Sequence, residues 1–254
     1  MPVVTTRAQE HLAVAATLGE YVWRRARNDS DCGPGLYWSS SRQYKNAITN
    51  ELWLLAFAKL ARLTDDTAAS KLYAARATML YDWFNKSGMR QASGRFAGLV
   101  LDGVESQDKG CAPRGLAFTY NQGVILGGLV ELGHLDEAVS IADHALLGLT
   151  TTEGVLHEPV GNIETSQDSP QFKGIFVRYL RYLTDALETK AGYQDNVKRY
   201  RSFLRSNAVF ACLHAAATIP GTDAVVYDAK WEGPFNHSSP TAQTSVLDLF
   251  TSCG

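Results

Sequence analysis

Apolar residues recur at spacings of three and four along most of the chain, which is the pattern of amphipathic helices. The pattern predicts about eight helices, over residues 6–27, 46–63, 67–85, 120–132, 135–149, 170–187, 194–217 and 241–250. Residues 96–104 instead alternate and include Asp102-Gly103, which predicts a small strand or hairpin in a long loop. The expected fold class is therefore all-α, with small β-hairpins in the long loops.

The predicted connections alternate between short and long. Short turns follow residues 63, 132 and 187, and helices joined so tightly are antiparallel neighbours. Long loops follow residues 27, 85, 149 and 217. Helical hairpins arranged in a ring would gather these loops at one end, where a ligand groove can form. We find no fixed repeat of an open solenoid and no linker, so residues 1–254 are expected to form a single domain.

Composition excludes two classes of partner. The 254 residues include 24 Lys and Arg against 26 Asp and Glu, a formal charge of −2, which lacks the basic excess of nucleic-acid-binding proteins. The longest apolar runs, 52–58 and 124–130, are far shorter than the roughly 20 residues that span a bilayer. We therefore expect no nucleic-acid partner and no membrane span.

Other features are typical of secreted proteins. Three Asn-x-Ser sequences, at 28–30, 85–87 and 236–238, match the N-glycosylation pattern, which is short and often matched by chance. The cysteines have no close Cys-x-x-Cys spacing, so one or two disulfides and buried unpaired thiols both remain open. They are Cys32, Cys111, Cys212 and Cys253. The first residues, however, lack the apolar stretch of a secretory leader.

Polar side chains cluster where predicted helices begin after long loops, in residues 45–51, 119–123 and 171–174. Asn46 and Asn50 are four residues apart and share a helix face, and Asn121 and Gln122 offer donors and acceptors that could bind sugar hydroxyls. The structural alternative for each is helix capping or core bonding. Three such starts together predict one polar rim.

Glycines and aromatic residues each leave two interpretations open. Glycines inside predicted helices favour close helix approach, and they are Gly123, Gly127, Gly128 and Gly174. Aromatic residues in the long loops could stack on sugars or cover the core, and they are Tyr37, Trp38, Trp231 and Phe235.

Glycoside hydrolysis usually needs two carboxyl groups. The adjacent pair Asp65-Asp66 lies on a tight helix-to-helix turn, where capping is the simpler interpretation. Single carboxyl groups near the predicted rim are Glu51, Asp102, Glu158 and Asp168. No Gly-x-Ser-x-Gly, His-Glu-x-x-His or phosphate-loop motif is present, and the histidines lack ligand spacing. We therefore expect no metal and no cofactor.

The strings at 45–51, 119–128 and 172–178 resemble glycoside hydrolase family 76, the endo-α-1,6-mannanases, as do segments 32–38, 98–103, 231–234 and 242–249. The resemblance implies an (α/α)6 toroid of six helical hairpins, of which about eight helices would be an incomplete set. It also implies an α-1,6-linked mannan or mannooligosaccharide as partner and a secreted or cell-wall location. The implied substrate-binding residues are Asn46, Asn50, Asp102, Tyr120, Asn121, Gln122 and Lys173.

The chain departs from the family at its catalytic residues. The family's catalytic Asp-Asp precedes the segment that matches 32–38, and residues 1–32 contain no such pair. Asp65-Asp66 falls at another position and does not inherit the role. We hypothesise an N-terminally truncated toroid with unknown catalytic residues, negligible hydrolysis and possible self-association through exposed apolar faces. The alternatives are a non-catalytic mannan-binding or cell-wall protein, or a wall transglycosidase, so whether the chain is an enzyme stays uncertain.

Overall fold

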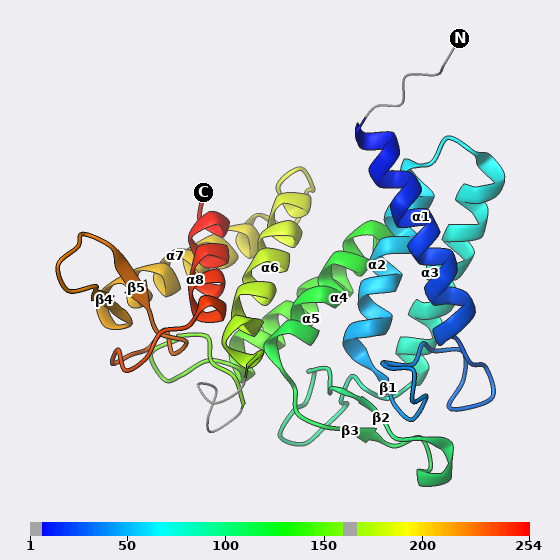
Figure 1. Ribbon diagram of the computed structural model, residues 1–254, viewed down its shortest axis with the longest axis horizontal. Coiled ribbons are helices and arrows are strands. Elements are labelled where there is room, and N and C mark those ends of the chain that lie inside the picture. The colour runs from blue at the N-terminus through cyan, green and yellow to red at the C-terminus, as the bar shows by residue number, and fades with distance from the viewer. Residues whose placement is uncertain (1–6, 160–166) are drawn as a thin grey trace. The chain divides into compact units, whose positions relative to one another are not determined.

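The computed structural model describes residues 7–159 and 167–254, and within them the chain folds mainly into helices (Figure 1). The eight α-helices of these residues are α1 (Arg7–Ala26), α2 (Ala47–Leu63), α3 (Thr67–Lys86), α4 (Thr119–Leu132), α5 (Leu135–Gly148), α6 (Phe172–Glu188), α7 (Gln194–His214) and α8 (Pro240–Ser252). The short strands are β1 (Lys45–Asn46), β2 (Gly103–Val104), β3 (Pro113–Arg114), β4 (Ala216–Thr218) and β5 (Val225–Tyr227). Two 3-10 turns are η1 (Gln107–Lys109) and η3 (Ser169–Gln171).

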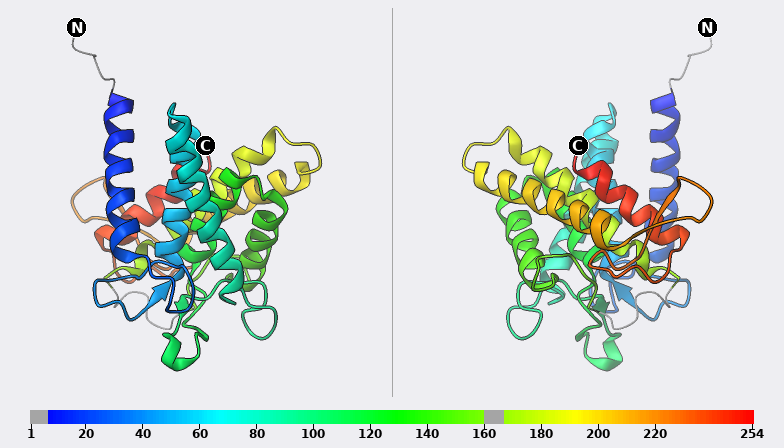
Figure 2. Two further views of the ribbon diagram at one scale, coloured as in Figure 1. Left: turned by 90° about the vertical axis from the view of Figure 1, so that its right-hand side faces the viewer. Right: turned by 90° about the vertical axis from the view of Figure 1, so that its left-hand side faces the viewer.

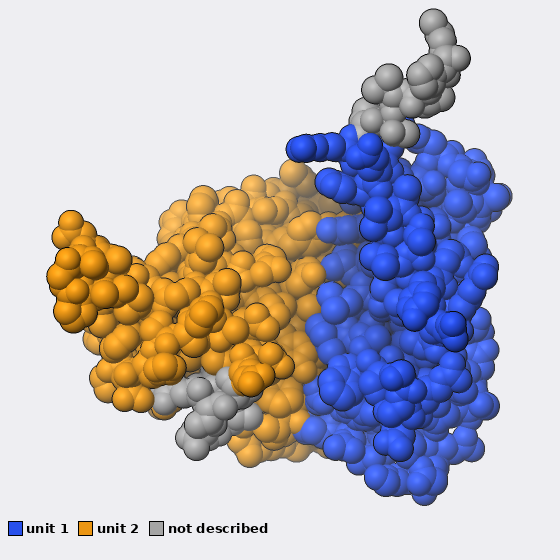
Figure 3. Space-filling model, in the orientation of Figure 1, with its two compact units in different colours: residues 1–91, 101–115 blue, residues 92–100, 116–254 orange. Residues whose placement is uncertain are grey.

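The chain divides into two compact units, coloured separately in Figure 3. Unit 1 comprises residues 1–91 and 101–115 and holds α1 to α3 with β1 to β3. Unit 2 comprises residues 92–100 and 116–254 and holds α4 to α8 with β4 and β5.

In unit 1, α2 packs against both α1 and α3. Leu54, Phe57, Leu80 and Phe84 are among the buried residues of the α2–α3 pair. The turn between these helices explains the adjacent aspartates, because the Asp66 carboxylate accepts hydrogen bonds from the amides of Ala68 and Ala69 at 2.8 and 2.9 Å. This confirms the interpretation of Asp66 as a helix cap.

The three-stranded sheet of unit 1 has the order β1-β2-β3, with Asn46 opposite Gly103. Of the small strand or hairpin predicted over 96–104, residues 103–104 form β2, which pairs with β3 in a hairpin, and Val100 makes an isolated bridge, but no strand extends over the earlier residues. Residues 94–99 form turns, in which the amides of Ala97 and Leu99 donate to the carbonyls three residues earlier. Because these two amides form hydrogen bonds within the turns, they cannot donate to a neighbouring strand.

In unit 2, α6 packs against α4, α7 and α8. A Cβ atom added at Gly123 would lie 2.6 Å from the Cα of Phe176, and one at Gly174 would lie 2.7 Å from the Cα of Ser245. The prediction that these two glycines permit close helix approach is confirmed.

The predicted end of one helix is wrong. Helix α7 ends at His214, whereas it was predicted to extend to residue 217, and residues 216–218 form β4 and pair with β5. The partner strand, Val225–Tyr227, consists of β-branched and aromatic residues that favour a strand. Pairing with β5, which follows after a short connection, overrides the strong helical preference of Ala216 and Ala217.

The predicted fold class is confirmed at the level of these units, which consist of packed helices with small antiparallel sheets in the loops. Within the two described stretches of chain, every helix is too short or too polar to cross a membrane.

Candidate functional site

The polar residues at the predicted helix starts lie in two groups, one in each unit. The unit 1 cluster consists of Tyr44, Lys45, Glu51 and Asp102, around the start of α2 and strand β2. The unit 2 cluster consists of Thr119, Glu158, Lys173 and Trp231, around the starts of α4 and α6. We describe each cluster by itself.

Three buried amides have a shared role that the sequence did not reveal. In each, the side-chain oxygen accepts from one loop amide, while the nitrogen donates to a loop carbonyl and to the carbonyl four residues earlier in its own helix. We call this arrangement an amide clasp. Asn50 clasps Leu36: its oxygen accepts from the Leu36 amide at 2.7 Å, and its nitrogen donates to the Leu36 carbonyl at 3.0 Å. Gln122 clasps Val100 with the same two bonds, both of 2.8 Å. Asn207 clasps the segment from Gly154 to Leu156 in the same way.

The clasps bear directly on two predicted sugar-binding residues. The amides of Asn50 and Gln122 also donate to the carbonyls of Asn46 and Phe118, so their polar atoms are engaged by the protein's own backbone. The side chain of Asn46 caps α2 by accepting from the amide of Thr49 at 3.2 Å. These three residues fit the structural alternative of capping and core bonding.

Glu51 stands out in the unit 1 cluster. Its side chain is 1% exposed, and neither carboxylate oxygen has a hydrogen-bond partner among the residues that the structure describes. Burial, and then the negative charge of Asp102, raise the pKa of Glu51 well above its usual value. Burial without a partner favours the protonated form of a carboxyl, and as an acid it can donate a hydrogen bond or a proton.

Asp102 is held rigidly at the half-buried edge of this cluster. The Tyr44 hydroxyl donates to its carboxylate at 2.6 Å, and its backbone carbonyl accepts from the amide of Ala47 at 2.7 Å. Gly115 has φ +88°, and a Cβ there would lie 2.6 Å from that of Asp102. The sheet register therefore places Asp102 against the start of α2.

The neighbouring Lys45 serves the loop before α2. Its ammonium group donates to the carbonyls of Asn28 and Gly33, both at 2.6 Å, and to that of Asp31. Burial lowers the pKa of Lys45 to about 8. A disulfide between Cys32 and Cys111 fixes the same loop. Of the two possibilities left open by the sequence, disulfides or unpaired thiols, this pair of cysteines therefore follows the first. Cys212 and Cys253 are unpaired.

In the unit 2 cluster, Glu158 joins the starts of two helices. Its carboxylate accepts from the Thr119 amide at 3.1 Å and from the Thr119 hydroxyl, and its charge acts on Lys173. Burial raises the pKa of Glu158 to about 7, although the bonds from Thr119 oppose the change. The sequence identified Glu158 only as an isolated carboxyl group near the predicted rim. The structure shows that Thr119 is its hydrogen-bond partner and that Lys173 is close enough to influence its pKa.

Lys173 is the buried cation of the same cluster. Its ammonium nitrogen lies 4.6 Å from the ring centroid of Trp231, within the range of a cation–π contact. Burial lowers the pKa of Lys173 to about 8, against the opposing effect of Glu232, Glu158 and Asp228. Trp231 is fully buried, so this loop aromatic covers the core, as one of its two interpretations proposed.

Asn121 is the predicted residue that most resembles an unfilled binding group. Its side chain is fully buried, and neither amide atom has a hydrogen-bond partner in the described part of the chain. The preceding Tyr120 lies beside Phe172, with 4.3 Å between ring centroids, so the starts of α4 and α6 adjoin. A buried amide without partners costs free energy unless a water or a ligand satisfies it.

Sequence reasoning missed two acids near Lys173. Asp228 is fully buried and accepts from the amides of Lys230, Asn236 and His237, each at 2.8 Å, so it organises the loop before α8. Glu232 follows Trp231, and one of its oxygens is buried without a partner among the described residues. The only available signal was the turn-rich composition of 220–240, which does not reveal acid pairing.

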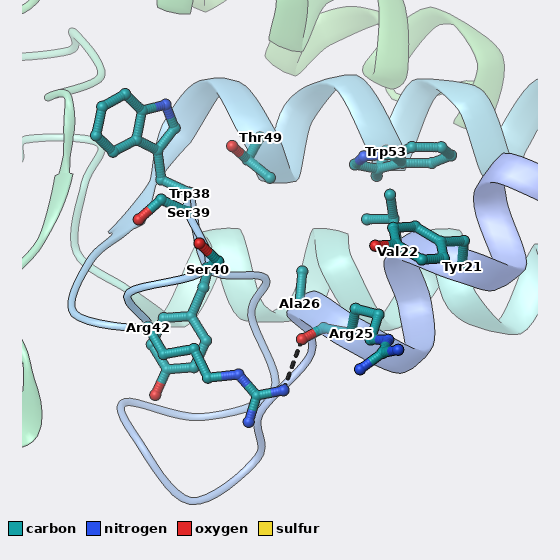
Figure 4. A pocket seen from close by; sticks show the side chains of 11 residues that line it. Tyr21, Val22, Arg25, Ala26, Trp38, Ser39, Ser40, Arg42, Thr49 and Trp53 are labelled. Atoms are coloured by element: carbon teal, nitrogen blue, oxygen red, sulfur yellow. Dashed lines mark hydrogen bonds between the residues drawn. The ribbon is translucent and has the colours of Figure 1, made fainter.

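Unit 1 also contains an open groove of about 690 Å³ between the C-terminal half of α1, the loop after it and α2 (Figure 4). Val22, Ala26 and Thr49 line it together with the aromatic side chains of Tyr21, Trp38 and Trp53. Trp38 is 63% exposed, unlike Trp231. In the described residues no three potential ligands among His, Cys, Asp and Glu converge in a metal-binding group.

Comparison with known proteins gives the family. The model of Glycosyl hydrolase family 76 matches residues 1–253. The chain is 26% identical over 240 residues to Mannan endo-1,6-alpha-mannosidase DCW1 of Saccharomyces cerevisiae, covering 87% of this chain and 50% of that protein. It therefore spans about half the length of this curated relative.

Solved structures agree on the fold. The GH76A alpha-1,6-mannanase of Salegentibacter sp. HEL1_6 has a TM-score of 0.78 at 23% identity, covering 98% of this chain and 70% of that one. An inactive variant of that enzyme, with two consecutive aspartates replaced by asparagine, was solved in complex with alpha-1,6-mannotriose. Dfg5 of Chaetomium thermophilum, solved in complex with glucosamine, has a TM-score of 0.73 at 21% identity, covering 95% of this chain and 59% of that one. The family model extends over nearly the whole chain, and on that ground the chain belongs to glycosyl hydrolase family 76.

Proposed function

We propose that this chain is a family 76 scaffold that binds α-1,6-linked mannooligosaccharides. The observation that carries the proposal is the buried Asn121 amide at the start of α4, neither polar atom of which has a partner in the described residues. Neutral acids and amides suit sugar hydroxyls, which both donate and accept. The mannotriose bound by the Salegentibacter enzyme variant supports the choice of ligand.

We further propose that this chain alone binds mannan without cleaving it. The adjacent aspartates in its sequence are Asp65 and Asp66, and the second of them caps α3. Hydrolysis of a glycoside needs an acid and a second carboxylate on opposite sides of one bond.

Titration calorimetry of the purified chain with α-1,6-mannotriose, followed by analysis of reducing ends, tests both parts. The expected result is heat of binding without new reducing ends. Release of reducing ends would contradict the non-catalytic part, and absence of heat would contradict binding. Glucosamine belongs in the same titration series, because the Chaetomium Dfg5 structure contains it, and a glucosamine-bearing acceptor would favour transfer between glycans over mannan binding alone.

We also propose a secreted or cell-wall location. The disulfide between Cys32 and Cys111 suits an oxidising compartment, and the Asn85 and Asn236 side chains of two N-glycosylation sequences are exposed. The fungal mannan endo-1,6-alpha-mannosidases among the relatives support the same location. Expression in a secreting fungal host, followed by glycosidase treatment and fractionation, checks this proposal.

A further inference from the structure

Helix α1 carries an exposed stripe along its whole length. Glu10, Val14, Leu18, Tyr21 and Arg25 follow one another at spacings of four, four, three and four, so they share one helix face. The three apolar members are 58%, 53% and 62% exposed, in chain order. We call these five residues the α1 stripe.

The other side of the same helix is the one that packs. Gly19 is the one buried residue of α1, all of whose residues are described, and a Cβ there would lie 3.1 Å from the ring of Phe57 and 3.5 Å from that of Trp53. Gly19 lies on the helix face opposite the centre of the stripe. In both views of Figure 2, α1 stands at an edge of unit 1. The stripe is therefore an apolar face that the packing of α1 onto α2 leaves exposed.

The stripe continues into the open groove of unit 1. Tyr21 and Arg25 belong to both, and Trp38 and Arg42 extend the lining on the loop side (Figure 4). The groove lining contains two arginines and no carboxylate. The two arginines of the groove can therefore attract an acidic side chain of a partner, and its aromatic side chains can pack against an apolar one.

We propose that the α1 stripe is the interface of an antiparallel dimer of this chain. A two-fold axis near Thr17 and Leu18 places Glu10 of one copy opposite Arg25 of the other, and Val14 opposite Tyr21, because each pair is equidistant from that axis along the helix. Each contact occurs twice, which is the self-complementarity that a two-fold interface requires. The two helix dipoles also oppose one another, which favours the antiparallel arrangement.

The charge distribution on α1 favours a second copy of this chain over an unrelated protein as the partner of the stripe. The acidic residue of the first turn is Glu10, and the basic residues of the last turn are Arg24 and Arg25. A second α1 running in the opposite direction delivers Glu10 to the positive rim beside Arg25 and Arg42. A helix of 20 residues is about 30 Å long, so the stripe offers a narrow contact along the length of α1. We therefore expect a weak, concentration-dependent dimer.

Sedimentation equilibrium of the full chain, over a range of concentrations, tests the proposal through a charge exchange. Arg25→Glu places two acidic groups opposite each other and is expected to weaken dimerisation about tenfold or more. Glu10→Arg is expected to have a similar effect. The double variant Glu10→Arg with Arg25→Glu restores the pairing with exchanged charges and is expected to recover the dimer.

Matched controls separate the stripe from general surface effects. Lys71→Glu makes the same charge change at an exposed position of α3 and is expected to leave the dimer intact. Leu18→Ser is expected to weaken the dimer, whereas Leu147→Ser, at an 83% exposed leucine of α5, is not. Far-ultraviolet circular dichroism confirms that each variant is folded.

Three results would overturn the proposal. The wild-type chain could be monomeric at every concentration, the double variant could fail to recover the dimer, or Leu147→Ser could disrupt it as much as Leu18→Ser. A monomer in which α-1,6-mannotriose protects Trp38 from fluorescence quenching would instead assign the groove to a saccharide. The proposal does not depend on mannan binding, so sedimentation and calorimetry can fail independently.

Discussion

Glu51 combines full burial, no hydrogen-bond partner among the described residues and a nearby carboxylate at Asp102. Its pKa is therefore higher in the folded chain than in the unfolded one. The contribution of Glu51 to the free energy of unfolding is fully present below the pKa of the unfolded state, near 4.3. It is lost as the pH rises toward the pKa of the folded state.

Glu51→Gln is expected to stabilise the chain at pH 8 and to change stability much less at pH 4. The reason is that glutamine stays neutral and does not have to lose a charge on burial. Urea unfolding of both proteins at the two pH values measures the difference. A variant that is less stable than the parent at pH 8 would indicate that the carboxylate form has a partner in the fold.

Glu158 gives a second pH dependence with a defined window. Its pKa rises to about 7 on folding, chiefly through burial. Stability from this group is therefore present below about pH 4.5 and is lost between there and about pH 7. Lys173 acts at higher pH, because its pKa falls to about 8, so its contribution is present above its unfolded pKa, near 10.4, and is lost as the pH falls to about 8.

Replacing Glu158 with Gln should flatten the unfolding free energy between pH 5 and 7, since the titrating group is gone. Unfolding curves at several pH values in that window provide the measurement, and Glu153→Gln, at an exposed position, is the control. An unchanged slope in the Glu158 variant would contradict the assignment.

Loss of the amide clasp made by Asn50 is expected to lower the free energy of unfolding substantially. Asn50→Leu keeps the approximate volume but leaves the amide and carbonyl of Leu36 without their partner. Each buried backbone group left unsatisfied costs about 1–3 kcal/mol, so the expected loss for the two groups is roughly 2–6 kcal/mol. Asn46→Ala, which removes a helix cap, should cost only about 1 kcal/mol. Equal losses in the two variants, measured by chemical unfolding, would argue against the clasp.

At the scale of elements, the disulfide stabilises the loop that precedes α2. Cys32 and Cys111 are separated by 79 residues, and closing a loop of that length in the unfolded chain is worth on the order of 4 kcal/mol. The double variant Cys32→Ser with Cys111→Ser is expected to lose most of that stability under oxidising conditions. Cys212→Ser, at an exposed thiol, is the control and should unfold like the parent protein.

Periodicity predicted the helices well because their apolar faces are strong and their caps are local. Helices α2, α3 and α5 begin and end within about one residue of the predicted limits, and Asp66 caps α3 as expected. The small sheets were predicted poorly, since β1, β2 and β4 are only two or three residues long and β1 pairs with β2 far along the chain. Strand β4 was taken for the end of a helix for this reason.

The candidate site could be predicted as a set of positions but not as a set of roles. The residue types at the starts of α2, α4 and α6 indicated polar groups at these positions, and their assembly into one sugar-binding rim stays a prediction. Sequence could not distinguish Asn50 and Gln122, whose amides fasten loops, from Asn121, whose amide has no partner in the described residues. That distinction depends on which loop lies within 3 Å of each amide.

At the scale of the whole molecule, membership of glycosyl hydrolase family 76 defines the class of ligand to test. Each cluster combines carboxyl groups with one lysine, Lys45 in unit 1 and Lys173 in unit 2. Mannooligosaccharides are neutral, so their binding should depend little on salt, unlike the association of charged partners.

Calorimetric titration of the purified chain with α-1,6-mannotriose tests the central claim most directly. Specific, saturable heat at low and high salt, without any increase in reducing ends, is the predicted result, and Asn121→Leu should abolish it while leaving the protein folded. No heat with mannotriose, or heat that Asn121→Leu leaves unchanged, would contradict the proposal that these helix starts bind mannan.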